Sequence, residues 1–169
     1  MRRHFTATGI LVEGSRTLLH WHKRLQQWMP PGGHIEPDED PVQAVLREVR
    51  EETGIAAEVI PAGPDFPFST PGQIQGPYAI LIEDIPELDE PHQHMDLIYF
   101  CRPMDGAGHD PALGDFHWLD ENALRSNQPL TLAACGVDLP LAEDVRLLAI
   151  KAIEAARVAA VPQGQKGDE

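Results

Sequence analysis

The pattern of hydrophobic and polar positions predicts short strands interrupted by two main helices. Apolar and β-branched residues indicate strands at residues 5–12 and 17–21, joined by a turn-like connection of hairpin length at residues 13–16. The same signals recur downstream and predict strands at residues 55–60, 78–83, 95–102 and 116–119. Strands mixed with helices favour an α/β fold in which the helices cover a mixed sheet.

The clearest local signal is a helix at Pro41–Thr53. Asp40 is a suitable N-cap, Gln43 completes a capping-box spacing and Gly54 fits the C-terminal cap. The apolar positions recur at the spacing of a core-facing helical stripe: Val42, Val45, Leu46 and Val49. Helical structure is also expected at residues 120–125, as a single turn, and at residues 141–160, whereas the Pro-Pro-Gly-Gly segment at 30–33 predicts a shaped loop.

The length and composition are those of one globular domain, with 169 residues, 42% hydrophobic and 24% charged. We expect a domain at residues 1–160 and a flexible tail at residues 161–169. The sequence contains no apolar run long enough to span a membrane, and its first ten residues lack the apolar region of a secretory leader, so a cytoplasmic location is expected. A monomer or homodimer is expected. Cys101 and Cys135 lack metal or redox spacing and are interpreted as reduced, partly buried thiols.

The charge balance limits the class of partner. The formal net charge is -14, with 27 acidic residues against 13 basic ones. Extended nucleic-acid binding depends on many basic contacts to phosphate, and it is therefore not expected. A small anionic substrate is compatible with this balance if a metal ion supplies positive charge.

Three glutamates in the predicted helix suggest such an ion. Glu48 lies three residues before Glu51 and four before Glu52, so their side chains are helical neighbours and repel one another. Arg47, four residues before Glu51, is within ion-pair reach and offers one form of compensation. A hard cation such as Mg²⁺, which prefers oxygen ligands, offers another. The alternative is a solvated helix face with no ligand.

The wider spacing resembles the Nudix box, the signature of the Nudix hydrolases. From Gly33 the chain has five residues, Glu39, seven further residues and then a continuous block that ends at Ile55. That block reads Arg47-Glu48-Val49-Arg50-Glu51-Glu52-Thr53-Gly54-Ile55. The resemblance implies an α/β/α sandwich and a metal-dependent hydrolase, using Mg²⁺ or Mn²⁺, that cleaves a diphosphate linkage in a nucleoside diphosphate joined to another group.

The resemblance also implies roles for particular residues. Glu48, Glu51 and Glu52 are expected as metal ligands, together with the backbone carbonyl of Gly32 or Gly33. Arg47 is expected to orient a glutamate through an ion pair. The general base is expected inside the box or on a later loop, with Glu51 and Glu48 as the first candidates. Two roles are considered for Glu39: a metal ligand, or a hydrogen-bond acceptor that supports the loop.

Candidate substrate contacts outside the box are less specific. His92, His94 and Asp96 share one face of an extended segment, where they either reach phosphate or metal or form a polar strand entrance. Aromatic residues near the Pro- and Gly-rich loop at residues 61–77 either stack on a base or pack the loop. The remaining candidates are His34, Lys23 and Arg24 as phosphate contacts, and Phe66, Phe68 and Tyr78 as aromatic ones.

The sequence determines neither the substrate nor whether the protein is an enzyme. Pro71, 16 residues beyond Ile55, resembles a proline feature of ADP-sugar hydrolases in the family, but the glutamate of the fuller pattern is missing. A non-catalytic metabolite-binding regulator is the alternative, although the box glutamates are intact. Diphosphate isomerisation would require an active-site Cys in a suitable motif, and RNA 5′-end hydrolysis is disfavoured by the acidic charge.

Overall fold

The computed structural model describes residues 2–85, 91–104, 108–133 and 136–160. Cys135 and the expected tail at 161–169 lie outside these residues. An eight-stranded mixed sheet forms the centre, with the order β3-β2-β1-β7-β5; β4 pairs with β1, β6 with β7 and β8 with β2. Its strands are β1 (Arg2–Glu13), β2 (Arg16–His22), β3 (Gln27–Met29), β4 (Gly32–His34), β5 (Ala57–Val59), β6 (Ala79–Ile85), β7 (His92–Pro103) and β8 (Phe116–Asp120).

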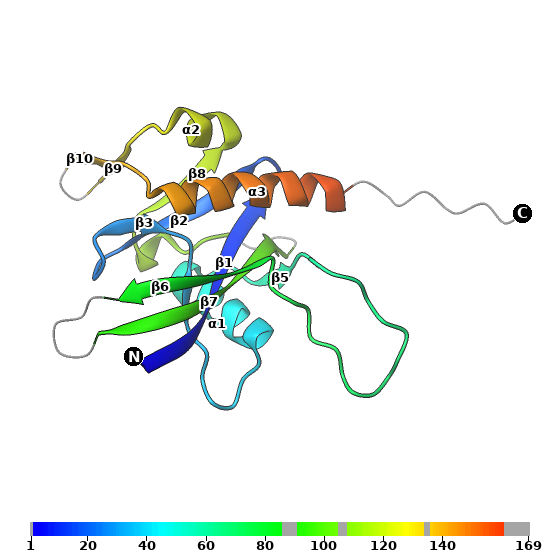
Figure 1. The fold of residues 1–169 in the computed structure, drawn as a ribbon. Helices are drawn as coiled ribbons and strands as arrows, with labels where there is room; N and C mark the ends of the chain where they lie inside the picture. Colours follow the sequence, from blue (N-terminus) through cyan, green and yellow to red (C-terminus); the bar gives the residue numbers. More distant parts are fainter. Residues whose placement is uncertain (1, 86–90, 105–107, 134–135, 161–169) are drawn as a thin grey trace, which may run out of the picture.

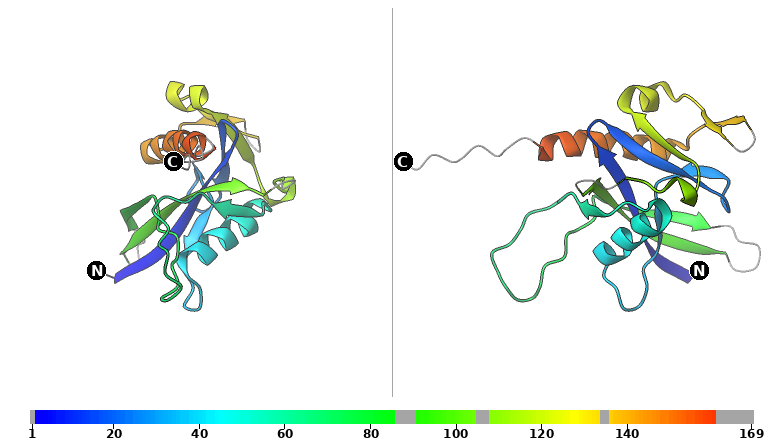
Figure 2. Two further views of the ribbon diagram at one scale, coloured as in Figure 1. Left: turned by 90° about the vertical axis from the view of Figure 1, so that its right-hand side faces the viewer. Right: turned by 180° about the vertical axis from the view of Figure 1, so that it is seen from behind.

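Helices cover the two faces of this sheet. In the views of Figures 1 and 2, α1 (Pro41–Thr53) and α3 (Glu143–Ala159) lie on opposite sides of the strands. The expected α/β fold with a mixed sheet is confirmed. The remaining elements are a 3₁₀ turn η1 (Pro111–Leu113), the short helix α2 (Glu121–Ser126), and a separate two-stranded sheet of β9 (Leu130–Leu132) and β10 (Val137–Leu139).

Alternation along β1 and β7 divides the core between the two helices. Ala7 and Leu11 of β1 belong to the cluster that packs under α1, whereas Ile10 and Val12 belong to the cluster beneath α3. This is the period of two that a strand imposes on its side chains. Gly9 faces α1 so closely that an added Cβ would lie 2.7 Å from Val49 Cγ2, so the helix sits directly on the strand backbone.

Helix α1 has the predicted limits and caps. The Asp40 carboxylate accepts hydrogen bonds from the backbone N–H groups of Val42 and Gln43, and the Gln43 side chain accepts one from the Asp40 N–H. Gly54 ends the helix with a φ of 77°, the left-handed region that glycine adopts without a Cβ clash. Local sequence therefore determines both ends of the helix that carries the glutamates.

The strand boundaries required correction. β7 and β1 extend three residues further at their starts than predicted, His92 against 95 and Arg2 against 5, whereas β5 is confined to Ala57–Val59. Strands β3, β9 and β10 were not predicted. The segment expected to be a loop at 30–33 instead enters β4, where Gly32 and Gly33 pair with Thr8 and Ala7.

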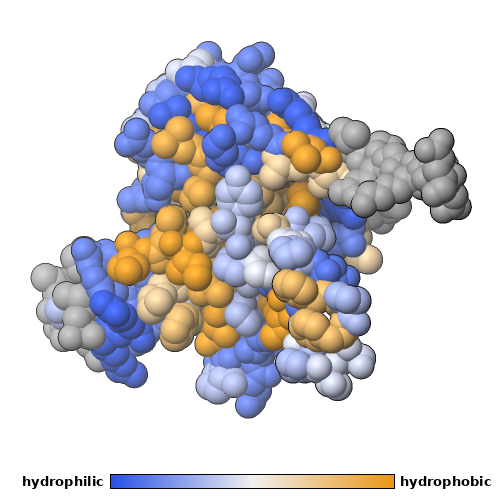
Figure 3. All heavy atoms as spheres, turned by 45° about the vertical axis from the view of Figure 1, so that its right-hand side comes forward, coloured by the Kyte–Doolittle hydropathy of each residue, from blue (hydrophilic) through white to orange (hydrophobic). Residues whose placement is uncertain are grey.

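A long connecting segment and several hydrophobic side chains are exposed at the surface. The segment between β5 and β6 extends away from the sheet (Figure 1). Hydrophobic residues gather on the face shown in Figure 3, and the exposed large hydrophobic side chains include Phe5, Ile80 and Ile82. Among the described residues, the helices are too short or too polar to cross a membrane.

Candidate functional site

Strand β4 brings two glycines against the glutamates of α1. Glu52 Oε2 accepts a hydrogen bond from the Gly32 N–H at 3.0 Å. The Glu48 carboxylate lies so close to Gly33 that an added Cβ would overlap it, with 2.6 Å to its Cδ. At Gly32 an added Cβ would lie 2.6 Å from the Thr8 hydroxyl. Both positions therefore require glycine, because strand β1 fills the space of a side chain at Gly32 and the Glu48 carboxylate fills it at Gly33.

Arg47 organises the outer side of the same cluster. Its guanidinium contacts Glu48 at 2.7 Å and Glu51 at 3.2 Å, and it donates to the His34 carbonyl at 3.1 Å. Two further bonds, at 2.6 and 3.1 Å, bind both oxygens of Glu39. Hydrogen bonds to Glu39 and Glu48 raise the pKa of Arg47, so the guanidinium stays charged. The expected ion pair is present, and Glu39 serves as a partner of Arg47 and of the Glu36 N–H.

Glu52 lies on the inner side of the cluster, away from Arg47. It faces His20, whose Nε2 lies 3.4 Å from Glu52 Oε2. Burial lowers the pKa of His20 to about 4, which leaves the imidazole neutral at pH 7. Burial, reinforced by Glu48 and Glu51, raises the pKa of Glu52 to about 7. His20 was missed by sequence reasoning, because only the pairing of β2 in the folded sheet reveals its position.

This donor set fits a hard divalent cation. Glu48 and Glu52 place carboxylate oxygens beside the β4 backbone, whereas Glu51 is more exposed and pairs with Arg47. Oxygen is the ligand type that Mg²⁺ and Mn²⁺ prefer. The raised pKa of Glu52 indicates that the negative charge there lacks compensation within the protein. At Gly32 the contact with Glu52 is made by the N–H group. A ligand role for the Gly32 or Gly33 carbonyl stays a prediction.

A cavity of about 400 Å³ adjoins these glycines on the side of the sheet covered by α3. Gly32 and Gly33 line it, so the same two residues contact both the glutamates and the cavity. The walls come from β1, β4, β6 and β7, the β2–β3 hairpin and α3. Its volume lies within the range of small-molecule binding pockets.

Asp96 lies deep in the lining of the cavity. Its carboxylate accepts hydrogen bonds from the hydroxyls of Thr6, at 2.9 Å, and Thr8, at 2.8 Å. Burial raises its pKa, although both hydroxyls act in the opposite direction. Glu83 also lines the cavity, and burial followed by the charge of Asp96 raises its pKa to about 7. The cavity therefore contains acidic groups that a cationic species would stabilise.

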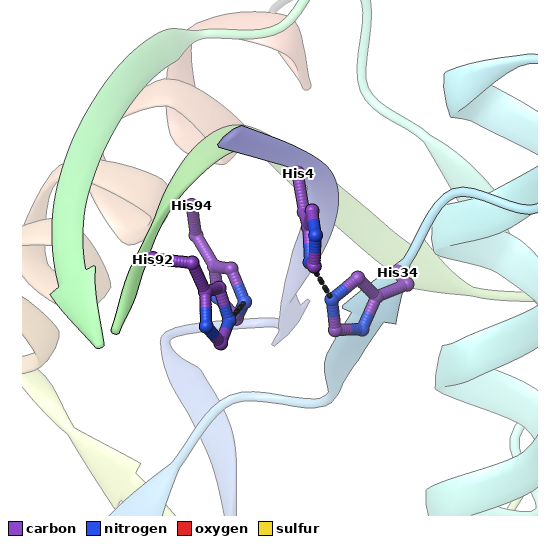
Figure 4. Close-up of side chains that lie close together, drawn as sticks. All are labelled: His4, His34, His92 and His94. Atoms are coloured by element: carbon purple, nitrogen blue, oxygen red, sulfur yellow. Dashed lines mark hydrogen bonds between the residues drawn. The ribbon is translucent and has the colours of Figure 1, made fainter. Parts of the chain in front are cut away.

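Four histidines gather at the edge of the cavity (Figure 4): His4 from β1, His34 from β4, and His92 and His94 from β7. The shared face predicted for His92, His94 and Asp96 is present, because all three line the cavity and the two rings are in contact. Burial, followed by the neighbouring rings, lowers the pKa of His94 to about 4. His4 was missed by sequence reasoning, since it lies at the start of the chain without a local motif.

The other predicted substrate contacts divide into two groups. Arg24 lines the cavity, whereas Lys23 is exposed in the turn between β2 and β3. Phe66 and Phe68 stack on each other in the exposed segment between β5 and β6, with ring centroids 5.7 Å apart. Tyr78 stacks on Phe100, with ring centroids 4.1 Å apart. The structure therefore brings Arg24 and the histidines to the cavity, and leaves Lys23 and the two phenylalanines outside the described cavity lining.

Comparisons with known proteins identify the family. The family model described as NUDIX domain matches residues 2–134, and this chain belongs to the Nudix hydrolase family. It is 33% identical over 103 residues to the CTP pyrophosphohydrolase of Escherichia coli (strain K12), covering 60% of this chain and 76% of that protein. It is 42% identical over 52 residues to the RNA pyrophosphohydrolase of Thioalkalivibrio sulfidiphilus (strain HL-EbGR7), covering 30% of each chain.

Solved structures agree on the fold. A hydrolase of the NUDIX family from Clostridium perfringens superposes with a TM-score of 0.67 at 22% sequence identity, covering 92% of this chain and 99% of that one. At this identity the likeness concerns the fold alone. The predicted Nudix resemblance is thus confirmed by family model, sequence relatives and architecture.

Proposed function

We propose that the protein is a metal-dependent pyrophosphohydrolase that cleaves a diphosphate linkage in a small nucleotide-type substrate. The observation that carries the proposal is the convergence of Glu48 and Glu52 on the glycines of β4, which also line the cavity. A substrate in the cavity would lie next to the carboxylates, separated from them only by a strand that has no side chains at Gly32 and Gly33.

Glu48, Glu51 and Glu52 would hold Mg²⁺ or Mn²⁺, with the carbonyl of Gly32 or Gly33 as a further oxygen ligand. Once bound, such an ion supplies positive charge to the phosphate oxygens and lowers the pKa of a coordinated water. The chemistry of the donor set supports this assignment, because carboxylate and carbonyl oxygens suit hard cations. Arg47 acts as a positioning residue, since one guanidinium contacts Glu39, Glu48 and Glu51 together.

The reaction requires a base for the attacking water. The water oxygen forms a bond to phosphorus, the anhydride P–O bond breaks, and the departing phosphate retains the bonding electron pair. A carboxylate accepts the proton that the water loses. Glu48 is favoured over Glu51 for this role, because its side chain is 14% exposed and lies against the cavity wall at Gly33, whereas Glu51 is 60% exposed.

The substrate class follows from size and charge. A cavity of about 400 Å³ suits a nucleotide-sized molecule, and Arg24 in the lining offers donors for phosphate oxygens. The net charge of -14 disfavours extended contacts with nucleic acid. Relatives named for CTP and for RNA indicate that both a free nucleotide and a 5′-triphosphate RNA end belong in the test.

The proposal is tested by product analysis of the purified protein with and without Mg²⁺ or Mn²⁺. The panel contains nucleoside triphosphates, ADP-ribose and other nucleotide sugars, dinucleoside polyphosphates, NADH, CoA and a short 5′-triphosphate RNA. We expect metal-dependent cleavage of one class of small substrate at a diphosphate linkage. Turnover that persists in excess EDTA would contradict the metal dependence. Binding of panel members without any turnover would instead favour the metabolite-binding regulator.

A further inference from the structure

Strand pairing gathers four histidines that the hydrolytic reaction does not require. The parallel register of β1 and β7 places His4 beside His94 and Arg2 beside His92, and the alternation of strand side chains turns His92 and His94 to one face. The antiparallel register of β4 places His34 opposite Thr6, two residues from His4. Three separate strands therefore deliver imidazoles to one place (Figure 4).

The spacing of the ring nitrogens matches a single ion. One ligand nitrogen from each histidine lies within 4.8 Å of the others. His4 Nδ1 is 3.2 Å from His34 Nε2, and His92 Nε2 is 3.1 Å from His94 Nε2. Nitrogens bound at about 2.0–2.1 Å to a tetrahedral Zn²⁺ lie about 3.3 Å apart. The separations of 3.1 and 3.2 Å are close to this value, and side-chain rotation would shorten any separation that approaches 4.8 Å.

The ring positions support the same geometry. Around a tetrahedral ion, imidazole ring centres lie about 5 Å apart, given metal–nitrogen bonds of about 2 Å. The centroids are separated by 4.7 Å for His4 and His92, 4.9 Å for His34 and His94, and 5.0 Å for His92 and His94. The separation is 5.2 Å for His4 and His34, and 6.2 Å for His4 and His94.

The donor chemistry separates this cluster from the glutamate site. Imidazole nitrogen is a ligand for Zn²⁺, Ni²⁺ and Cu²⁺, whereas Mg²⁺ takes oxygen ligands. The side chain of His34 is exposed and offers an ion a path from solvent. The carboxylates of Glu83, Asp96 and Asp144 line the same cavity and would attract a cation without belonging to the set of four nitrogens.

We propose that His4, His34, His92 and His94 bind one borderline divalent transition-metal ion, of which Zn²⁺ is the representative, at a site separate from the box glutamates. The ion ties the beginning of β1 to β4 and β7 and places positive charge at the edge of the cavity. This inference does not depend on hydrolytic activity. The competing explanation is a pair of N–H···N hydrogen bonds, between His4 and His34 and between His92 and His94, which needs no metal.

The test is an isothermal titration calorimetry experiment in which Zn²⁺ is added to the metal-free protein in the presence of millimolar Mg²⁺. Co²⁺ then replaces Zn²⁺, because tetrahedral Co²⁺ absorbs visible light much more strongly than octahedral Co²⁺ does. We expect one Zn²⁺ per chain and a tetrahedral Co²⁺ spectrum. Millimolar Mg²⁺ competes for oxygen ligands but not for imidazole nitrogens, so Zn²⁺ binding that persists in its presence favours the histidines.

Variants assign the ion to its ligands. His94→Ala removes a partly buried ligand and His34→Ala an exposed one, so the second variant still reports if the first disturbs the fold. Each should weaken Zn²⁺ binding by at least about tenfold, since even removal of groups behind the ligands has this effect. His109→Ala, which alters a histidine that packs on Phe116, and Glu52→Gln should both retain the ion.

Two results would overturn the inference. One is the absence of Zn²⁺ binding by the wild-type chain, which would leave the cluster as hydrogen-bonded rings without a metal ion. The other is Zn²⁺ binding that survives in both His34→Ala and His94→Ala but is lost in Glu52→Gln, which would assign the ion to the glutamates. Neither result bears on whether the protein hydrolyses nucleotides, because that activity is measured separately with Mg²⁺ or Mn²⁺.

Discussion

At the scale of single residues, the site depends on the missing side chain of Gly33. The Glu48 carboxylate occupies the space where a Cβ would lie, so Gly33→Ala must displace either the carboxylate or the strand. We expect kcat to fall on the order of tenfold to a hundredfold, because small misplacements of reacting groups have effects of this size. The measurement is steady-state kinetics with Mg²⁺ on the substrate found in the panel.

A matched glycine provides the control for this prediction. Gly63 has no heavy atom within 4 Å of an added Cβ, so Gly63→Ala should leave kcat unchanged. Equal kcat values for wild type and Gly33→Ala would show that the position of Glu48 against β4 is irrelevant to turnover.

At the scale of elements, helix α1 holds Glu48 and Glu52 against strand β4. Asp40→Ala removes the carboxylate that accepts from Val42 and Gln43. We expect the free energy of unfolding to fall by about 1 kcal/mol, the usual cost of losing an N-cap. Chemical denaturation measures this, with the exposed Asp38→Ala as a control that should stay near wild type. Equal losses in the two variants would refute a capping role for Asp40.

The elements also show how far sequence reasoning extends. Helix α1 was predictable because its caps and apolar stripe are local, and the box residues were predictable because their spacing is a recognised motif. Strand β4 was not, because Gly32 and Gly33 carry no strand signal and pair with β1 only through tertiary structure. His4 and His20 were missed for a similar reason, since their roles arise from neighbours distant in sequence. Phe66 and Phe68 were predicted as aromatic substrate contacts, whereas in the structure their rings stack on each other.

At the scale of the whole molecule, the layer between β1, β7 and α1 excludes water from Cys101. The Cys101 thiol is free and fully buried, and burial raises its pKa to about 12. Because thiolate is the reactive form, we expect iodoacetamide at pH 8 to leave Cys101 unmodified in the native Cys135→Ser variant and to modify it after unfolding. Mass spectrometry reads the label. Native labelling as fast as that of an exposed thiol would contradict this packing.

The whole molecule also separates two chemical environments across strand β4. Oxygen donors of α1 lie on one side, and the cavity with its four nitrogen donors lies on the other. We propose that a substrate reaches the glutamates at Gly32 and Gly33, the two residues that contact the carboxylates and also line the cavity. On this proposal, hydrolysis requires both the glutamates of α1 and the cavity beside β4, and α1 alone is not sufficient.

The central claim is that Glu52 helps to hold a catalytic metal ion. The most direct measurement compares the Mg²⁺ dependence of kcat for wild type, Glu52→Gln and the control Glu58→Gln, whose side chain pairs with Arg102 on the surface. We predict at least about a hundredfold loss for Glu52→Gln, since even residues behind metal ligands cost up to about a hundredfold, with Glu58→Gln near wild type. Wild-type turnover and Mg²⁺ dependence in a folded Glu52→Gln protein would contradict the account.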